Sequence, residues 1–308
     1  MPLPSSGTLS LSRIAVTDGA NSVGVVTPYS LGQLSKLTSK NFVWDGIYVQ
    51  YATSISSFYN WAGYGFKYES PDILHDFGLS SRYPTNSSAI IDTSGNGRNG
   101  TFVTGTNNGT PVNVANYTTT YPGRIQTSPT GQYSVRLNDI AKYGGTQQFT
   151  WIAWFRCTGF PTSFNGIIAC EGRSGSTPIG QSVYISNTSG TFIQYERWNG
   201  TSGSVVTARL TFGAGGIPAF VSGKWYMMGL AFGGGGGILS LFVDGTQYTN
   251  VFTTSVSVST DANWGCFAGL RYNQWLEGEL GLVATYPIWF NNIPMNDFNY
   301  RTRIRYDI

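Results

Sequence analysis

Charge is scarce in this chain of 308 residues. Only 11% of its residues are Asp, Glu, Lys or Arg, against about 25% in an ordinary soluble domain. The formal net charge is +3 and no basic block occurs, which argues against nucleic-acid binding through a charged face. No apolar run approaches the ~18 residues of a membrane-spanning helix. We therefore expect neither nucleic acid nor a membrane as a partner.

Cysteine is also rare. The three cysteines, Cys157, Cys170 and Cys266, are odd in number and form no CxxC motif, which argues against a disulfide framework or a zinc site. Buried thiols in a reducing compartment are the expectation. The first residues, "MPLPSSGTLSLSR", lack the basic leader and apolar stretch of a signal peptide. The chain is thus expected to be made in a cytosol.

Helix-forming patterns are few. Two short amphipathic helices are predicted at 30–37 ("SLGQLSKL") and 54–61 ("SISSFYNW"), and "IPMNDFNYR" near the C-terminus offers a proline in a first helical turn. We interpret residues 1–65 as a separate docking module with short helices. So small a module buries little apolar surface alone and needs a partner.

Glycine, hydroxyl residues and aromatics fill the remaining chain. From residue 66 onward, apolar runs of four to ten residues alternate with Gly, Asn, Ser or Pro, which favours an antiparallel β-sandwich or barrel over 66–308 rather than βα units. The runs predicted as strands are "QFTWIAWFRC", "FNGIIACEG", "QSVYIS", "TFIQYERW", "SVVTARLTF", "KWYMMGLAF", "ILSLFV" and "LGLVATYPIWF".

Five consecutive glycines lie between two of these runs, in "WYMMGLAFGGGGGILSLFVDGTQY". A phosphate-binding loop would continue with a lysine, a hydroxyl residue and a helix, whereas Ile238 and Leu239 follow here. The glycines are therefore predicted to connect two strands of a hairpin. Asp244 and Gly245 predict a second tight turn, because glycine readily adopts positive φ.

The order of four segments carries a family resemblance. "FTWIAWFR", "GKWYMMGLAF", "LSLFVDG" and "LEGELGLVATYPIWFNNIPMNDF" follow one another as in concanavalin A-like, laminin-G-type jelly rolls, and "DTSGNGRNGTF" at 92–102 resembles a turn found in phage and bacterial members. The resemblance spans roughly residues 70–305. It implies an all-β fold: an antiparallel β-sandwich of the concanavalin A-like jelly-roll type.

The N-terminal module resembles the opening of tailed-phage virion proteins, on the residues "LPSSGTLSLSRI", "YSLGQLS" and "SISSFYNW". This resemblance implies a virion structural protein made in the host cytoplasm, docked to other virion subunits through residues 1–65 and expected to form a homo-oligomer. The displayed jelly roll would be a tail or fibre adhesin for a host surface glycan, or a head-decoration protein.

An enzyme of the same fold is the first alternative. Glycoside hydrolysis needs two carboxylates at a fixed separation, and jelly-roll glucanases carry them in an "E-x-D-x-x-E" strand. Glu277 and Glu279 in "LEGELG" are predicted to share one strand face, but the central Asp and the third carboxylate are missing. His75, the one histidine, has no "G-x-S-x-G" companion and is predicted to be a surface or packing residue. We expect no enzyme activity; a bacterial lectin-like surface protein is the other alternative.

No cofactor is predicted, although calcium, common in the resembling family, stays open. Asp92 and Asn96 offer oxygen ligands at close spacing, as do Asp244 and Asp261. A calcium loop of the EF-hand kind would hold more carboxylates. The favoured interpretation of Asp92 is an Asx-type turn, in which the side chain bonds the backbone two residues on.

Two aromatic segments are candidate glycan platforms. In "YERWNG", Tyr195 and Arg197 would lie on one face of a strand, and Glu196 and Trp198 on the other; residues on the same face are said to share a parity. The segment "RYNQWLEG" is similarly rich. Both also suit contacts with another subunit, which favour Trp, Tyr and Arg. The candidate glycan or subunit contacts are Tyr195, Arg197, Trp198, Arg271, Tyr272 and Trp275.

Overall fold

The computed structural model describes part of the chain. The chain divides into two units, Met1–Ser70 and Pro71–Ile308, and every described residue lies in the second. The predicted N-terminal helices and the predicted boundary between residues 65 and 66 lie outside the described residues. The described ranges are 71–77, 88–92, 94–104, 110–111, 117–118, 124–127, 133–137, 147–160, 166–171, 179–188, 190–199, 204–233, 237–253, 265–267 and 276–303.

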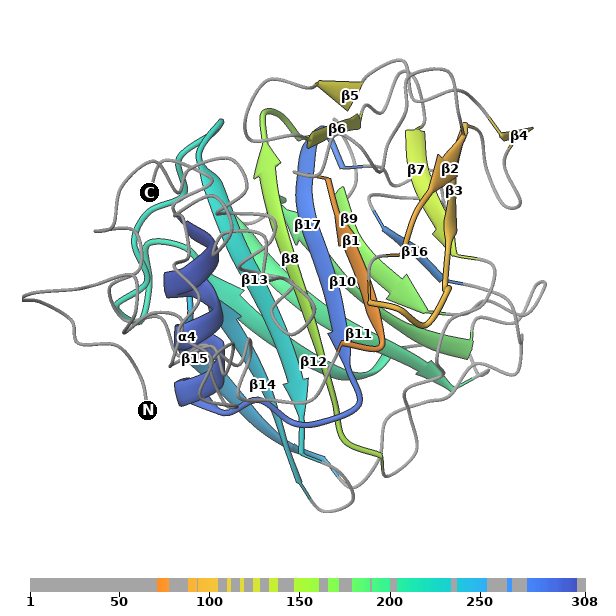
Figure 1. The fold of residues 1–308 in the computed structure, drawn as a ribbon. Helices are drawn as coiled ribbons and strands as arrows, with labels where there is room; N and C mark the ends of the chain where they lie inside the picture. Colours follow the sequence, from red (N-terminus) through yellow and green to blue (C-terminus); the bar gives the residue numbers. More distant parts are fainter. Residues whose placement is uncertain are drawn as a thin grey trace, which may run out of the picture. The chain divides into compact units, whose positions relative to one another are not determined.

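The described residues of the second unit form two antiparallel sheets and one helix (Figure 1). The first sheet has the order β15-β14-β13-β8-β17-β6-β5, with β1 also paired to β17. Its strands are β1 (Ile73–Asp76), β5 (Tyr117–Thr118), β6 (Arg124–Thr127), β8 (Phe149–Cys157), β13 (Trp225–Phe232), β14 (Gly237–Val243), β15 (Thr246–Thr253) and β17 (Gly278–Tyr286).

The second sheet has the order β12-β11-β10-β9-β16-β7-β3-β2, with β4 also paired to β3. The chain passes between the sheets several times, so strands distant in sequence become neighbours. Its strands are β2 (Ala89–Ile90), β3 (Gly100–Thr104), β4 (Thr110–Pro111), β7 (Tyr133–Leu137), β9 (Gly166–Glu171), β10 (Ile179–Ser186), β11 (Phe192–Asn199), β12 (Ser204–Thr211) and β16 (Gly265–Phe267).

The all-β prediction is confirmed: the described residues form antiparallel strands and one helix at the C-terminal end. All eight runs predicted as strands coincide with β8–β14 and β17, within a few residues at their ends. The predicted helix near the C-terminus is α4 (Asn292–Thr302), whose N-cap residue Asn291 accepts a hydrogen bond from the N–H of Ile293.

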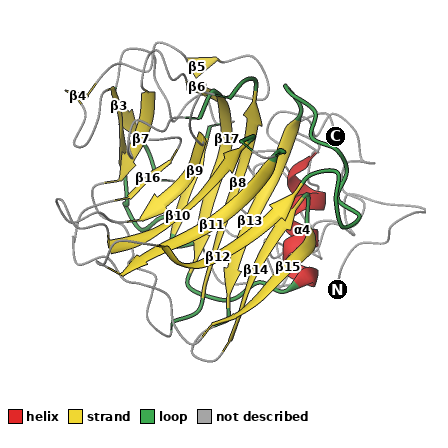
Figure 2. Cartoon of the chain, turned by 180° about the vertical axis from the view of Figure 1, so that it is seen from behind, coloured by secondary structure: helices red, strands yellow, loops and turns green. Residues whose placement is uncertain are grey.

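One hydrophobic core lies between the two sheets, which Figures 1 and 2 show one in front of the other. Strand alternation supplies its side chains. Phe155 of β8 and Met228 of β13 point inward from the first sheet, and Val183 of β10 and Tyr195 of β11 point inward from the second. β13 is buried along its whole length, as predicted for a central strand.

The predicted hairpin of β13 and β14 and the predicted turn after β14 are confirmed. β13 and β14 are antiparallel neighbours, and the N–H of Gly233 donates to the carbonyl of Ile238 across the glycine connection. Asp244 and Gly245 have φ of 48° and 80°, the positive values that a two-residue hairpin turn requires. The glycine run therefore connects strands in a hairpin.

Helix α4 covers the outer face of the first sheet. Gly229 of β13 leaves room for Met295, whose sulfur lies 2.7 Å from where a Cβ on Gly229 would stand. The indole N–H of Trp154 donates to the Thr302 hydroxyl at 2.7 Å. In the described part of the chain, no helix has both the length and the apolar character needed to span a membrane.

Candidate functional site

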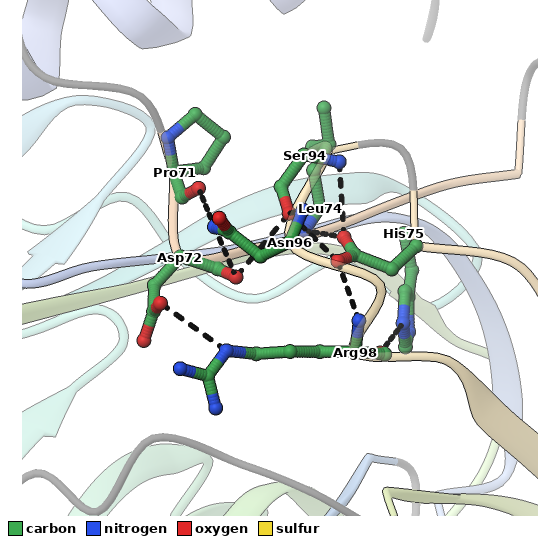
Figure 3. A network of polar contacts seen from close by, with 8 residues as sticks. Pro71, Asp72, Leu74, His75, Ser94, Asn96 and Arg98 are labelled. Atoms are coloured by element: carbon green, nitrogen blue, oxygen red, sulfur yellow. Dashed lines mark hydrogen bonds and ion pairs between the residues drawn. The ribbon is translucent and has the colours of Figure 1, made fainter.

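The "DTSGNGRN" segment builds a polar cluster around Asp92, here called the Asp92 clasp and made of Asp72, Asp92, Ser94, Asn96 and Arg98. Figure 3 shows this network of polar contacts. Asp92 Oδ1 accepts hydrogen bonds from the N–H of Leu74 at 2.9 Å and of Ser94 at 3.0 Å. Asp92 Oδ2 accepts from the Ser94 hydroxyl at 2.7 Å and from the N–H of Arg98 at 2.9 Å.

The remaining bonds of the clasp tie this loop to the start of β1. The side-chain amide of Asn96 donates to the carbonyls of Pro71 and Asp72, both at 3.1 Å. Arg98 Nε lies 3.2 Å from Asp72 Oδ1. Because β1 is a four-residue strand that pairs, among the described strands, with β17 alone, these bonds fasten it to the loop before β3. The clasp is thus a structural device.

The predicted Asx-type turn at Asp92 is confirmed by the bond from the Ser94 N–H. Burial alone would raise the pKa of Asp92, but hydrogen bonds from Leu74, Ser94 and Arg98 outweigh it and hold the pKa below its usual value. Four N–H and O–H donors surround this carboxylate, so neutral dipoles stabilise its charge. Among the described residues, no group of three or more His, Cys, Asp or Glu side chains could hold a metal ion.

The other two oxygen donors considered for calcium have different outcomes. Asp244 Oδ1 accepts a hydrogen bond from the N–H of Met227 at 2.9 Å, and Asp244 Oδ2 lies 3.8 Å from Lys224 Nζ. This carboxylate therefore links the turn after β14 to β13. Asp261 lies outside the described residues.

His75 is a packing residue, one of the two roles predicted for it. Its side chain is fully buried on β1, and Nε2 lies 3.2 Å from the carbonyl oxygen of Arg98. Since a carbonyl only accepts, the neutral ring carries its proton on Nε2. Burial lowers the pKa of His75 from 6.5 to about 4.

We expect the free energy of unfolding to decrease as the pH falls below 6.5. In the unfolded chain His75 is protonated as the pH falls through 6.5, whereas in the folded chain it stays neutral down to about pH 4. The stabilisation from neutral His75 is therefore complete above pH 6.5 and decreases below it. Between pH 7 and 5 the loss is about 2 kcal/mol. Urea titrations at both pH values measure it. His75→Gln, which does not titrate, should flatten the dependence; an equal slope in the variant would contradict the assignment.

The carboxylates considered for glycoside hydrolysis do not share a strand face. Glu277 precedes β17, which begins at Gly278. Glu279 is buried and forms an ion pair with Arg156, its cross-strand partner on β8. The prediction that the two glutamates lie on one face is therefore wrong, because the strand starts between them.

A second polar cluster lies on the second sheet, on the side opposite the core. Tyr184 of β10, Gln194 of β11 and Arg209 of β12 are direct cross-strand neighbours. Together with Glu196 they form what we call the polar ladder. The hydroxyl of Tyr184 and the amide of Gln194 both donate to Glu196 Oε1, and Arg209 Nε donates to Gln194 Oε1 at 2.7 Å.

The ladder reaches solvent at its β12 end. Tyr184 and Gln194 are buried, Glu196 is half-buried and Arg209 is exposed. The Arg209 guanidinium lies over the ring of Phe192, with Cζ 4.0 Å from the ring centroid. Stacking and hydrogen bonding together hold the cation in place. The exposed Arg209 cation and the half-buried Glu196 carboxylate can bind the hydroxyl groups of a polar ligand. The buried Tyr184 and Gln194 hold these two groups in place through their hydrogen bonds.

The structure describes only some of the residues predicted as glycan or subunit contacts. Tyr195 is fully buried, and its hydroxyl donates to Gln181 Oε1 at 3.1 Å, so its predicted role as a surface contact is wrong: β11 turns this parity toward the core. Trp198 lies opposite Gly180 in the strand register, with the parity of Gln194 and Glu196. The side chains of Arg197 and Trp198, and all of Arg271, Tyr272 and Trp275, lie outside the described residues.

Sequence reasoning missed the ladder. Gln194 and Glu196 stand within a predicted strand, but their partners Tyr184 and Arg209 lie on two other strands. A signal existed: polar residues alternate with apolar ones in "FIQYER" and "TARLT", as in strands with one face away from the core. Which alternate positions become neighbours depends on strand register.

No protein-family model and no curated protein sequence matches this chain. Among solved structures, domain 4 of AbnA, an extracellular GH43 arabinanase from Geobacillus stearothermophilus in complex with arabinotriose, is similar with a TM-score of 0.50 and 14% identity over 75% of this chain and 98% of that domain. The binding domain of botulinum neurotoxin serotype G has a TM-score of 0.50 and 10% identity over 75% of this chain. This chain covers 50% of that second structure. The shared fold is a β-sandwich.

Proposed function

We propose that this protein is a virion structural protein that binds carbohydrate through its β-sandwich and acts without turnover. The observation that carries the binding part is the polar ladder, because its hydrogen bonds and the Phe192 ring hold the exposed Arg209 cation in place, in one network with the half-buried Glu196 carboxylate. Groups held in place before binding lose little freedom when a ligand arrives.

The structural neighbours support this proposal by analogy of fold. One was solved with arabinotriose and another is a toxin binding domain. The strand order, in which the chain passes repeatedly between two antiparallel sheets, is compatible with the concanavalin A-like jelly roll that the sequence motifs resemble.

The virion part of the proposal rests on the resemblance of residues 1–65 to the opening of tailed-phage virion proteins. This module would dock the chain to other subunits, and several copies would display the β-sandwich toward a host surface glycan. Glu279 supports action by binding, because its carboxylate is occupied by Arg156.

We expect Arg209→Ala to weaken glycan binding about tenfold or more, since a hydrogen bond from a charged group contributes about 1.5–3 kcal/mol. The full chain is first screened on an array of bacterial surface polysaccharides with arabinotriose included, and the tightest glycan is then titrated calorimetrically. Lys224→Ala, which removes a partly exposed cation just before β13 of the first sheet, is the matched control and should bind like the unaltered chain.

Two results would overturn the binding proposal: no glycan bound by the full chain, or equal affinity for the Arg209 and Lys224 variants. Release of reducing ends from a bound polysaccharide would overturn action without turnover.

The virion assignment is tested separately, by gold-labelled antibody against the β-sandwich on purified particles. Label on tails or fibres supports an adhesin, label over heads supports a decoration protein, and unlabelled particles with an accessible epitope contradict the assignment.

A further inference from the structure

Cys170 and Cys266 lie directly opposite each other on neighbouring strands of the second sheet. β16 pairs with β9 in the register Cys266↔Cys170 and Phe267↔Ala169. In antiparallel pairs the Cα atoms of opposed residues stand about 4.5 or 5.5 Å apart, and disulfides join Cα atoms about 4.4–6.8 Å apart. The register alone therefore brings two cysteines from distant parts of the sequence within reach of a disulfide.

In the strand register both cysteines stand at positions that alternate with core positions. Ala169 pairs with Val183, a core residue, so the neighbouring position Cys170 belongs to the other face. Cys170 pairs with Ser182, which in turn pairs with Glu196 of the polar ladder. The cysteine pair thus continues a cross-strand row on the face that carries the ladder.

A cation lies beside this pair in the register. On the side away from Cys170, Cys266 pairs with Arg136 of β7. A neighbouring guanidinium favours the thiolate over the thiol. From this register we expect Cys266 to be the first of the two cysteines to react.

We propose that Cys170 and Cys266 are a cross-strand disulfide site, oxidised by thiol–disulfide exchange with a low-molecular-weight disulfide such as oxidised glutathione. The Cys266 thiolate attacks one sulfur of the glutathione disulfide and expels one glutathione thiolate. The Cys170 thiolate then attacks the Cys266 sulfur of the mixed disulfide and expels the second. Two protein thiols become one disulfide, both electrons and both protons pass to two molecules of glutathione, and no metal takes part.

The disulfide would fasten β16, a strand of three residues, to β9. It would also close a loop of roughly one hundred residues, and restricting so long a loop stabilises a fold mainly through the unfolded chain. The site is independent of the proposed function. A chain made in a reducing cytosol would carry the two thiols and acquire the bond on reaching an oxidising medium.

Cys157 is the internal control. Its side chain is buried in the core, and Sγ donates to the carbonyl of Gly159 at 3.0 Å. Burial raises the pKa of this thiol to about 12. It should therefore stay a thiol under conditions that oxidise the other two.

The first experiment uses the unaltered full chain. After equilibration with oxidised glutathione, free thiols are alkylated under denaturing conditions and peptides are analysed by mass spectrometry without reduction. A linked Cys170–Cys266 peptide with alkylated Cys157 is the expected result, together with a melting temperature that falls by about 5–10 °C on reduction. Alkylation of both cysteines, or links between chains in place of the internal bond, would overturn the proposal.

The second experiment uses Cys170→Ser and Cys266→Ser. Each variant should match the reduced wild-type chain in melting temperature and lose its response to reductant. With oxidised glutathione, Cys170→Ser should trap a mixed disulfide at Cys266 faster than Cys266→Ser traps one at Cys170. Equal rates would overturn the order of attack, and a melting temperature that still responds to reductant would overturn the site.

Discussion

Gly278→Ala lowers the free energy of unfolding by about 3 kcal/mol or more, because a side chain at this position meets backbone. A Cβ built there would stand 1.8 Å from the carbonyl oxygen of Arg156 and 3.1 Å from the Cα of Cys157. Both atoms belong to β8, the strand paired with β17 at the centre of the first sheet. Backbone in a central strand cannot swing aside as the end of a flexible side chain can, so the two strands must separate locally. Denaturant unfolding of the full chain measures the loss.

Gly223→Ala is the matched control for this substitution. Gly223 has φ of 78°, and no atom lies within 4 Å of where its Cβ would stand. Its replacement should cost only about 1 kcal/mol, the ordinary price of a left-handed conformation for a residue with a side chain. Equal losses for the two variants would contradict the close approach of β17 to β8.

Asp92→Ala has the second largest expected effect, a loss of about 3–5 kcal/mol in the free energy of unfolding. The substitution leaves the buried N–H of Leu74 and the half-buried N–H groups of Ser94 and Arg98 without their acceptor. A fully buried unsatisfied donor costs about 1–3 kcal/mol, and each half-buried one adds less. Calorimetric melting and denaturant titration at pH 7 both measure the change. Because β1 depends on this clasp, hydrogen exchange at Leu74 should speed up more than exchange in β13.

Asp92→Asn separates the two halves of the clasp. The asparagine oxygen can still accept from Leu74 and Ser94, but its amide cannot accept from Arg98. We expect about half of the loss seen with alanine. The stabilisation by Asp92 also depends on pH, because the pKa of Asp92 in the folded chain is below its usual value. Its contribution to the free energy of unfolding is complete at a pH above the pKa of the unfolded chain. It is lost as the pH falls through the lower pKa of the folded chain. Equal stability of the asparagine and aspartate chains would show that Arg98 does not depend on this carboxylate.

The strands of the sandwich were predictable because their signals are local. The apolar "WYMMGLAF" indicated a central strand, and β13 is buried throughout. The turn at Asp244 and Gly245 and the Asx-type turn at Asp92 depend on residues within two positions of each other. For the same reason the helix near the C-terminus was found at its proline.

The binding face could not be predicted in the same way. The alternation of side chains along a strand places Tyr195 and Glu196 on opposite faces of β11. Both faces of β11 carry aromatic and polar residues, so the sequence pattern did not show which face packs against the core. The tertiary structure buries Tyr195 and turns Glu196 toward the ladder. The start of β17 at Gly278 was missed as well, because the close approach to Arg156 that requires a glycine there involves a strand far away in the sequence.

Local sequence patterns thus account for the all-β fold class of this chain, its glycine-dependent turns and the positions of most central strands. It works there because strand pattern and turn geometry depend on neighbouring residues alone. The polar ladder, the pairing of Glu279 with Arg156 and the opposition of Cys170 and Cys266 were decided by tertiary structure. Each depends on the register of strands distant in sequence, and a register shifted by one residue would reverse the faces and separate every one of these partners.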